Sequence, residues 1–323
     1  MTADNPVLAE VVRSGFTESR HRGSAVALAA DGQILVEAGA IREPMFPRSS
    51  NKPLQASAML RAGLQLDGKL LALAAASHSG EDFHVTGVRE ILADAGLTED
   101  ALQCPPDLPL DEDARREHIL AGGIADRVHM NCSGKHAAML ATCVINQWPT
   151  ESYTEPEHPL QQRIGAVISE LAGEPVAAIG VDGCGAPLMA ISVLGLARAF
   201  RAVVLADPGS PERAVADAMR AYPAWTSGTT RPERFLMDAV PGLLLKGGAE
   251  GVDGFALADG RAGALKIDDG APRGRVPVTV ALLRELGAER EPGADAAALR
   301  RLAATEVLGG GRVVGEIRPT RWQ

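Results

Sequence analysis

Lysine is scarce in this chain of 323 residues. Lysine and arginine together number 32, and the only lysines are at positions 52, 69, 135, 246 and 266. Aspartate and glutamate number 41, so the formal net charge is −9. Because no run of basic residues is present, this balance predicts that the protein has no nucleic-acid partner. A motif that contains lysine is also rarer by chance here than in an average protein.

Cysteine and long apolar stretches are scarce as well. Four cysteines are too few for a disulfide framework in a chain of this length. The longest apolar stretches, such as residues 70–76, are far shorter than the about 20 residues that cross a bilayer. The first 15 residues contain Asp4 and lack the apolar region of a secretory signal. We therefore predict a cytoplasmic protein that does not associate with a membrane.

Strand patterns occupy both ends of the chain. Residues 24–39 contain two apolar runs joined by Asp31-Gly32, a typical hairpin turn. Residues 254–270 repeat this pattern, and residues 313–317 add a short strand. Apolar residues at helical spacing predict helices within residues 54–64, 138–145, 160–171 and 278–286. These patterns predict an α+β fold in a single domain over residues 1–323, with a mainly antiparallel sheet from both chain ends flanked by helices.

A Ser-x-x-Lys motif directly precedes the first helical pattern, in the sequence Arg48-Ser49-Ser50-Asn51-Lys52. Residues three apart lie on one face of a helix, so Lys52 can reach the Ser49 hydroxyl. An uncharged lysine can take the serine proton, and N–H groups at the helix start can stabilise an oxyanion. This composition gives roughly 0.2 such motifs by chance. The alternative is a helix-capping serine beside a solvated lysine.

Four further segments concentrate polar, thiol or glycine residues. They are ASHSGED at 76–82, HMNCSGKH at 129–136, DGCGAP at 182–187 and KGGAEG at 246–251. Two thiolates and a nitrogen donor can hold zinc, but neither Cys132 nor Cys184 belongs to a C-x-x-C pair, so the spacing indicates a metal only weakly. Taken singly, each segment also fits a polar turn, a buried cysteine or a helix C-cap.

Taken together, RSSNKPLQA, ASHSGED, NCSGKHAAML, DGCGAP and KGGAEG, in this order, resemble the rhizobial, inducible and thermolabile type of L-asparaginase, the Asparaginase_II family. The resemblance implies a fold similar to serine β-lactamases and glutaminases, and a homodimer. It also implies two Ser-Lys pairs, Ser49 with Lys52 and Ser77 with Lys246. Residues 226–237 match the glycine-arginine segment of this family only loosely.

The resemblance further implies a zinc ion held by two cysteines and a lysine, which are Cys132, Lys135 and Cys184 in this chain. It places three more residues around the same site, namely Arg48, His136 and Asp182. We expect Zn²⁺ to organise the site. Arg48 or Asp182 is expected to bind the charged α-groups of the substrate through charge-assisted hydrogen bonds, Arg48 the carboxylate and Asp182 the ammonium group.

The expected function is hydrolysis of L-asparagine to L-aspartate and ammonia through a serine acyl-enzyme. In this hypothesis Lys52 takes the Ser49 proton, while Ser77 and Lys246 relay protons to the leaving nitrogen. The sequence does not decide which serine attacks first. Two alternatives remain, another serine amidohydrolase such as a glutaminase and a non-catalytic protein that binds zinc or an amino acid. A β-lactam substrate is disfavoured because the chain contains no Ser-Asp-Asn.

Overall fold

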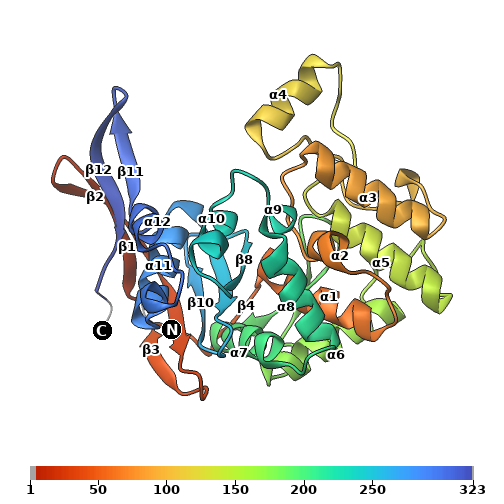
Figure 1. Cartoon of the computed structure of the whole chain (residues 1–323), viewed down its shortest axis with the longest axis horizontal. Helices are drawn as coiled ribbons and strands as arrows, with labels where there is room; N and C mark the ends of the chain where they lie inside the picture. The colour runs from red at the N-terminus through yellow and green to blue at the C-terminus, as the bar shows by residue number, and fades with distance from the viewer. Residues whose placement is uncertain (1–4, 322–323) are drawn as a thin grey trace.

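The computed structural model describes residues 5–321, which form an antiparallel sheet packed against helices (Figure 1). The main sheet has the strand order β11-β12-β1-β2-β10-β9-β8, and β3 pairs with β2 beside this path. The strands are β1 (Val7–Arg13), β2 (Phe16–Leu28), β3 (Ile34–Ala38), β8 (Leu244–Gly248), β9 (Val252–Ala256), β10 (Ala262–Ile267), β11 (Thr305–Gly309) and β12 (Arg312–Pro319). The predicted α+β class and the sheet built from both chain ends are confirmed.

Both predicted hairpins are present in this sheet. β2 pairs with β3 across Asp31-Gly32, and β9 pairs with β10 across Asp259-Gly260. Gly32 and Gly260 have φ values of 90° and 91°. Glycine adopts this left-handed backbone region without a steric cost, so the turn residues explain where each hairpin reverses.

The four predicted helices correspond to α1 (Lys52–Arg61), α5 (Ser133–Asn146), α6 (Pro159–Ala172) and α11 (Arg275–Glu285). Most side chains of α1 and α5 are buried, so these two helices run through the interior. A 3-10 turn at Arg48–Asn51 precedes α1, so Ser49 lies in the turn and Lys52 begins the α-helix. The other helices are α2 (Gly68–Ala74), α3 (Asp82–Asp94), α4 (Glu112–Leu120), α7 (Val193–Leu205), α8 (Pro211–Ala221), α9 (Pro223–Thr226), α10 (Pro232–Ala239) and α12 (Ala296–Leu302).

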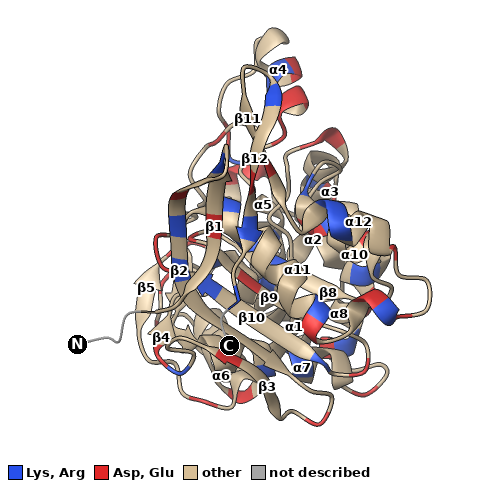
Figure 2. Ribbon diagram, turned by 90° about the vertical axis from the view of Figure 1, so that its left-hand side faces the viewer, with Lys and Arg blue, Asp and Glu red and all other residues tan. Residues whose placement is uncertain are grey.

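One hydrophobic cluster includes side chains from the sheet and from the helices on both sides of the molecule. Helix α7 packs on β9 and β10, and α11 packs on β10 and β12. The single-domain prediction stays a prediction. No helix within the described residues is both long and apolar enough to span a bilayer. Figure 2 shows acidic and basic residues interspersed over the face that it presents.

Strand β8 and the turn before α1 lie in direct contact, and this contact positions the site. A Cβ atom on Gly248 would lie 2.6 Å from the carbonyl oxygen of Pro47 and 3.1 Å from the backbone nitrogen of Ser50. A side chain at this position would therefore push the strand away from the turn. The glycine that follows Lys246 and Gly247 is thus required by the close approach of β8 to the Ser49 turn.

Candidate active site

A cavity of about 410 Å³ opens between the turn that precedes α1 and strand β8. Three residues of the predicted Ser-Lys pairs line it, namely Ser49, Ser77 and Lys246. Other polar and charged residues, none of them predicted individually as a site residue, also line it, namely Asn131, Ser227, Arg231, Glu233, Glu250 and Arg275. The structure therefore brings three of the four predicted catalytic residues to one cavity wall.

Ser77 lies between two buried lysines. Lys52 Nζ is 2.9 Å and Lys246 Nζ is 3.1 Å from the Ser77 hydroxyl oxygen. Lys52 also donates to the carbonyl of Ala76 at 2.5 Å, and Lys246 donates to that of Gly247 at 2.6 Å. A hydroxyl can accept from a charged amine and donate to an uncharged one, so Ser77 can connect the two lysines as a proton relay.

Lys246 has an unusual electrostatic environment. Burial lowers its pKa to about 7, with the positive charge of Lys52 acting in the same direction and the carboxylate of Glu233 opposing it. A large fraction of Lys246 is therefore uncharged at neutral pH. An uncharged amine beside a hydroxyl is the arrangement that activates a serine nucleophile or relays its proton.

Arg275 binds two buried acids next to Lys246. Its guanidinium donates to Asp253 at 2.5 Å and to Glu233 at 2.8 Å, and Thr279 donates to Asp253 at 2.6 Å. Burial alone would raise the pKa of Glu233, but the charge of Arg275, aided by Arg231, lowers it to about 2. Glu233 is therefore a carboxylate at neutral pH and offsets part of the positive charge around the lysines.

Ser49 lines the same cavity from the turn before α1. No hydrogen bond joins Ser49 to the Lys52 amine within the described residues, because that amine is directed to Ser77 and Cys132. The motif therefore brings Ser49 and Lys52 into one site without a direct contact between them. Arg48 has a φ of 52°, a strained value for a residue with a side chain. Such strain is concentrated at functional sites, and here it directly precedes Ser49.

The three predicted metal ligands converge beside this network. Cys132, Lys135 and Cys184 are all buried, and Lys135 Nζ lies 3.1 Å from Cys184 Sγ. A hydrogen bond from Cys132 and the charge of Lys135 lower the pKa of the Cys184 thiol. Thiolate sulfur and a nitrogen donor are ligands that suit Zn²⁺, so this donor set fits the predicted ion. Lys52 Nζ, 3.1 Å from Cys132 Sγ, links these residues to the hydrogen bonds around Ser77.

The three residues predicted to bind the substrate do not themselves line the described cavity, although Arg48 lies next to Ser49, which does. Arg48 Nε donates to Asp182 at 2.8 Å, and the two side chains form an ion pair. His136 is fully buried, and its Nδ1 lies 2.7 Å from the Tyr153 hydroxyl. None of the predicted trio is among the described residues that line the cavity, so their contact with substrate stays a prediction.

Sequence reasoning missed three charged residues that line the cavity, Arg231, Glu233 and Arg275, as well as Asp253, which Arg275 binds. Arg231 and Glu233 belong to residues 226–237, where the family resemblance is loose. Asp253 lies in a strand whose five residues are all buried, and a charged residue in an otherwise apolar strand was a usable signal. Arg275 carried no such signal, because it begins a helix and its partners are distant in sequence.

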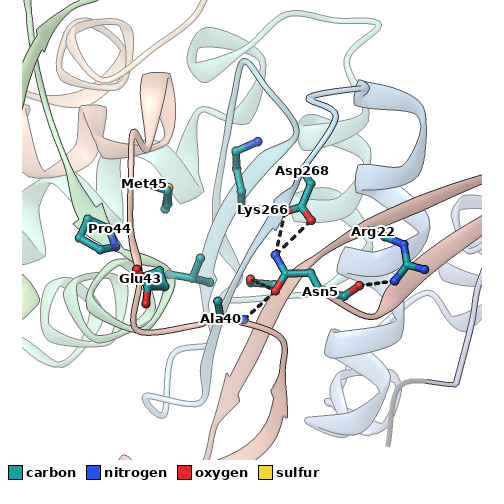
Figure 3. Close-up of a pocket in the computed structure, with 10 residues that line it drawn as sticks. Asn5, Arg22, Ala40, Glu43, Pro44, Met45, Lys266 and Asp268 are labelled. Atoms are coloured by element: carbon teal, nitrogen blue, oxygen red, sulfur yellow. Dashed lines mark hydrogen bonds between the residues drawn. The ribbon is translucent and has the colours of Figure 1, made fainter. Parts of the chain in front are cut away.

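A second cavity of about 340 Å³ lies beside β10 (Figure 3). The Asn5 amide donates to both carboxylate oxygens of Asp268, at 2.9 and 3.1 Å, and Arg22 donates to the Asn5 carbonyl at 2.7 Å. Lys266 Nζ donates to the carbonyl of Glu250 at 2.8 Å. Its polar groups are thus bound largely to one another, and none of the predicted site residues lines it.

Similarity to solved structures is weak. The chain is 15% identical to Mglu in its native form in 4.3 M NaCl, over 85% of this chain and 62% of that one, with a TM-score of 0.46. It is 13% identical to EstCE1, described as a hydrolase with promiscuous acyltransferase activity, over 82% of this chain and 93% of that one, with a TM-score of 0.43. The chain thus spans less than two thirds of the Mglu chain. No match was found among the curated proteins.

The sequence profile of one family, described as L-asparaginase II, matches residues 9–319. The match contains both predicted Ser-Lys pairs and all three predicted metal ligands. Because it extends over nearly the whole chain, it does not depend on any single motif. The chain therefore belongs to the L-asparaginase II family, a family of amidohydrolases.

Proposed function

We propose that this protein hydrolyses the side-chain amide of L-asparagine through a serine acyl-enzyme and releases ammonia and L-aspartate. The observation that carries the proposal is the Ser77 hydroxyl between the amines of Lys52 and Lys246, in a cavity that Ser49 also lines. Membership of an amidohydrolase family supports the same class of reaction.

Ser49 is the proposed nucleophile. It lines the cavity at the first turn of a helical segment, where unpaired backbone N–H groups can stabilise an oxyanion. Lys52 first passes a proton through the Ser77 hydroxyl to Lys246, whose pKa of about 7 allows it to accept one. The uncharged Lys52 amine then turns towards Ser49 and takes its proton. The Ser49 oxygen then bonds to the amide carbon, the carbon–nitrogen bond breaks, and ammonia leaves with a proton from this relay. Water cleaves the ester, which yields L-aspartate and restores the Ser49 hydroxyl.

Arg231 is the proposed partner of the substrate's α-carboxylate. Arg231 lines the cavity, and its buried Nε, 3.6 Å from the Glu233 carboxylate, has no hydrogen-bond partner among the described residues. Glu250, which also lines the cavity, is the proposed partner of the α-ammonium group. Arg48 lies 2.8 Å from Asp182 and 3.7 Å from Glu250, so we propose that Arg48 and Asp182 act on the substrate indirectly, by holding Glu250 in place.

Zn²⁺ is the proposed ion for Cys132, Lys135 and Cys184, with a structural role. When bound, it would hold the loop before α5 in position, which matters because Asn131 lines the cavity and Cys132 contacts Lys52. A homodimer is also proposed, on the family resemblance alone, and analytical ultracentrifugation of the purified chain tests it.

The decisive experiment measures ammonia release from L-asparagine and L-glutamine in parallel. We expect the unaltered protein to prefer L-asparagine, and Ser49→Ala to lower kcat by roughly 10³-fold or more, because a nucleophile is lost. Ser19→Ala, in β2 and away from the cavity, is the matched control and should retain full activity. Absence of ammonia from either amide would leave the non-catalytic alternative as the better description.

Trapping the acyl-enzyme separates the two serines. Peptide mass spectrometry after rapid quenching with a slowly hydrolysed asparagine analogue is expected to locate the aspartyl group on Ser49. A label on Ser77 would exchange the roles of the two serines and leave the hydrolase proposal in place. In that case Lys246 would act directly on the attacking hydroxyl, since the two groups are 3.1 Å apart.

A further inference from the structure

Helix α4 projects from the body of the molecule, as Figures 1 and 2 both show. None of its nine residues is buried, and the side chains of Ile119 and Leu120 are 50% and 79% exposed. An isolated helix of this length is marginal in water, and packing of an apolar face normally stabilises it. Helix α4 lacks that packing in the described structure, so polar contacts must hold it.

Helix α4 and the loop that follows it contain three potential metal ligands. His118, Asp126 and His129 each offer one ligand atom, and these atoms all lie within 4.8 Å of one another. Asp126 lies 2.8 Å from Nδ1 of His129, and the rings of His118 and His129 have centroids 4.2 Å apart. Ligand atoms around a tetrahedral Zn²⁺ are about 3.4 Å apart, so small side-chain movements suffice to enclose an ion.

Backbone groups nearby contact the side chains of this cluster. His118 Nε2 donates to the carbonyl of Ile124 at 2.9 Å, which leaves the lone pair on its other ring nitrogen. A backbone acceptor of this kind commonly orients a metal-binding histidine. Gly123 lies so close to the His118 ring that a Cβ atom there would be 2.4 Å from it. Asp126 also accepts from the backbone N–H of His129 at 2.9 Å, and it pairs with Asp107 in an isolated bridge.

We propose that His118, Asp126 and His129 form a second site for a divalent metal ion, with Zn²⁺ preferred, that fastens α4 to the loop leading to Cys132. Two imidazoles and one carboxylate leave a coordination position for water and suit Zn²⁺. The ion replaces the proton that His129 shares with Asp126. This site lies outside the cysteine set and does not depend on the proposed reaction.

The proposed metal site lies between two segments of the chain that line the cavity. Leu110, just before α4, lines the cavity, and the backbone N–H of Asp111 donates to the carbonyl of Ser79 at 3.0 Å. On the other side of α4, the chain returns through His129 to Asn131, which also lines the cavity. A metal ion that holds α4 to the loop at His129 would therefore also restrain the two segments that contribute Leu110 and Asn131 to the cavity wall.

Cobalt spectroscopy on the full-length chain tests the proposal. The cysteine set is first removed with Cys184→Ser, and the protein is freed of metal with a chelator. On this background we expect one equivalent of Co²⁺ to bind at micromolar concentration, with visible ligand-field bands and without the near-ultraviolet bands of thiolate ligation. Adding His118→Gln should weaken binding at least tenfold. Arg116→Gln, on the same helix, is the matched control and should bind as tightly as the background.

Thermal unfolding and hydrogen exchange provide a second readout. On the Cys184→Ser background, Zn²⁺ should raise Tm and slow amide exchange in α4 for Arg116→Gln, and neither effect should occur with His118→Gln. Equal binding by the two variants, or no binding to the Cys184→Ser background, overturns the proposal. If Cys184→Ser does not fold, Zn²⁺ is counted by mass spectrometry in His118→Gln and Arg116→Gln with all cysteines retained. The proposal then requires one equivalent fewer in His118→Gln.

Discussion

The cavity beside Ser77 and the cavity beside β10 are similar in size, about 410 and 340 Å³, and each has a lysine in its wall. Lys246 in the first cavity contacts a hydroxyl and lies near a second amine, Lys52. Lys266 in the second cavity donates to the carbonyls of Glu250 and Ile267. Burial lowers the pKa of both lysines, but the neighbouring charges differ: Lys52 reinforces the shift at Lys246, whereas Asp268 opposes it at Lys266.

This difference teaches that volume and charge do not by themselves make an active site. In the second cavity, donors and acceptors bind one another, so a ligand would have to compete with existing hydrogen bonds. In the first cavity, an amine with a pKa of about 7 is left beside a hydroxyl, and the Nε of Arg231 has no hydrogen-bond partner among the described residues, although Glu233 lies 3.6 Å from it. Identical substitutions in the two cavities should therefore have unequal effects.

Lys246→Met is the change with the largest expected effect on this comparison. It removes the amine that accepts the relayed proton and leaves an apolar side chain of similar length. We expect kcat to fall by roughly 10²- to 10⁴-fold, the range for loss of a general base. Circular dichroism and Tm verify that the variant is folded. Activity within a few-fold of the unaltered protein would show that Lys246 is only a structural lysine.

The dependence of kcat/KM on pH tests whether the uncharged form of Lys246 is essential. The pKa of Lys246 is lowered to about 7, so the uncharged form predominates above that pH and is lost below it. We therefore expect kcat/KM to rise with pH, by up to tenfold per unit below about pH 7, and to level off above it. If kcat/KM stayed constant between about pH 5.5 and about pH 8, the uncharged form of Lys246 would not be essential.

Arg231→Gln is expected to have an intermediate effect. It removes the charge proposed to bind the substrate's α-carboxylate, and charge-assisted hydrogen bonds contribute about 1.5–3 kcal/mol. We expect kcat/KM to fall by about 10- to 100-fold, mainly through KM. Arg22→Gln makes the same change in the wall of the second cavity and is the control. Equal kinetics for the two variants would exclude Arg231 as the carboxylate partner.

Lys266→Met is expected to have the smallest effect. The side chain is bonded to backbone carbonyls and contributes to neither Ser-Lys pair. Steady-state kinetics should give kcat/KM within about twofold of the unaltered protein, in line with substitutions away from a site. A loss similar to that of Lys246→Met would mean that the second cavity takes part in the reaction, and the contrast between the cavities would be lost.

The fold was largely predictable because its signals are local. Asp31-Gly32 lies between two apolar runs, and helical spacing identified the segment that forms α6. The start of α5 at Ser133 was missed by the apolar pattern, because the polar residues Lys135 and His136 are buried there. Burial of polar residues depends on partners elsewhere in the chain, and a local pattern does not reveal such partners.

Several residues of the site could be predicted from the sequence, but their contacts with one another were harder to predict. The spacing of Ser49 and Lys52 suggested a direct pair, yet the Lys52 amine donates to Ser77. The contact between Ser77 and Lys246 came from the family resemblance, since 169 positions separate them. Arg275 acquires its role through Glu233, which lies in another helix. Side-chain direction and long-range ion pairs are properties of tertiary packing, and a single sequence carries little information on them.

The sheet built from both chain ends has a consequence for synthesis on the ribosome. Residues 23–28 of β2 emerge early, but the strand that covers one of their edges, β10, emerges only after all the helices of the central region. This buried apolar edge remains open in the nascent chain, which favours pairing with other chains. Such late closure gives a high contact order, so refolding from denaturant should be slow and should benefit from a chaperone.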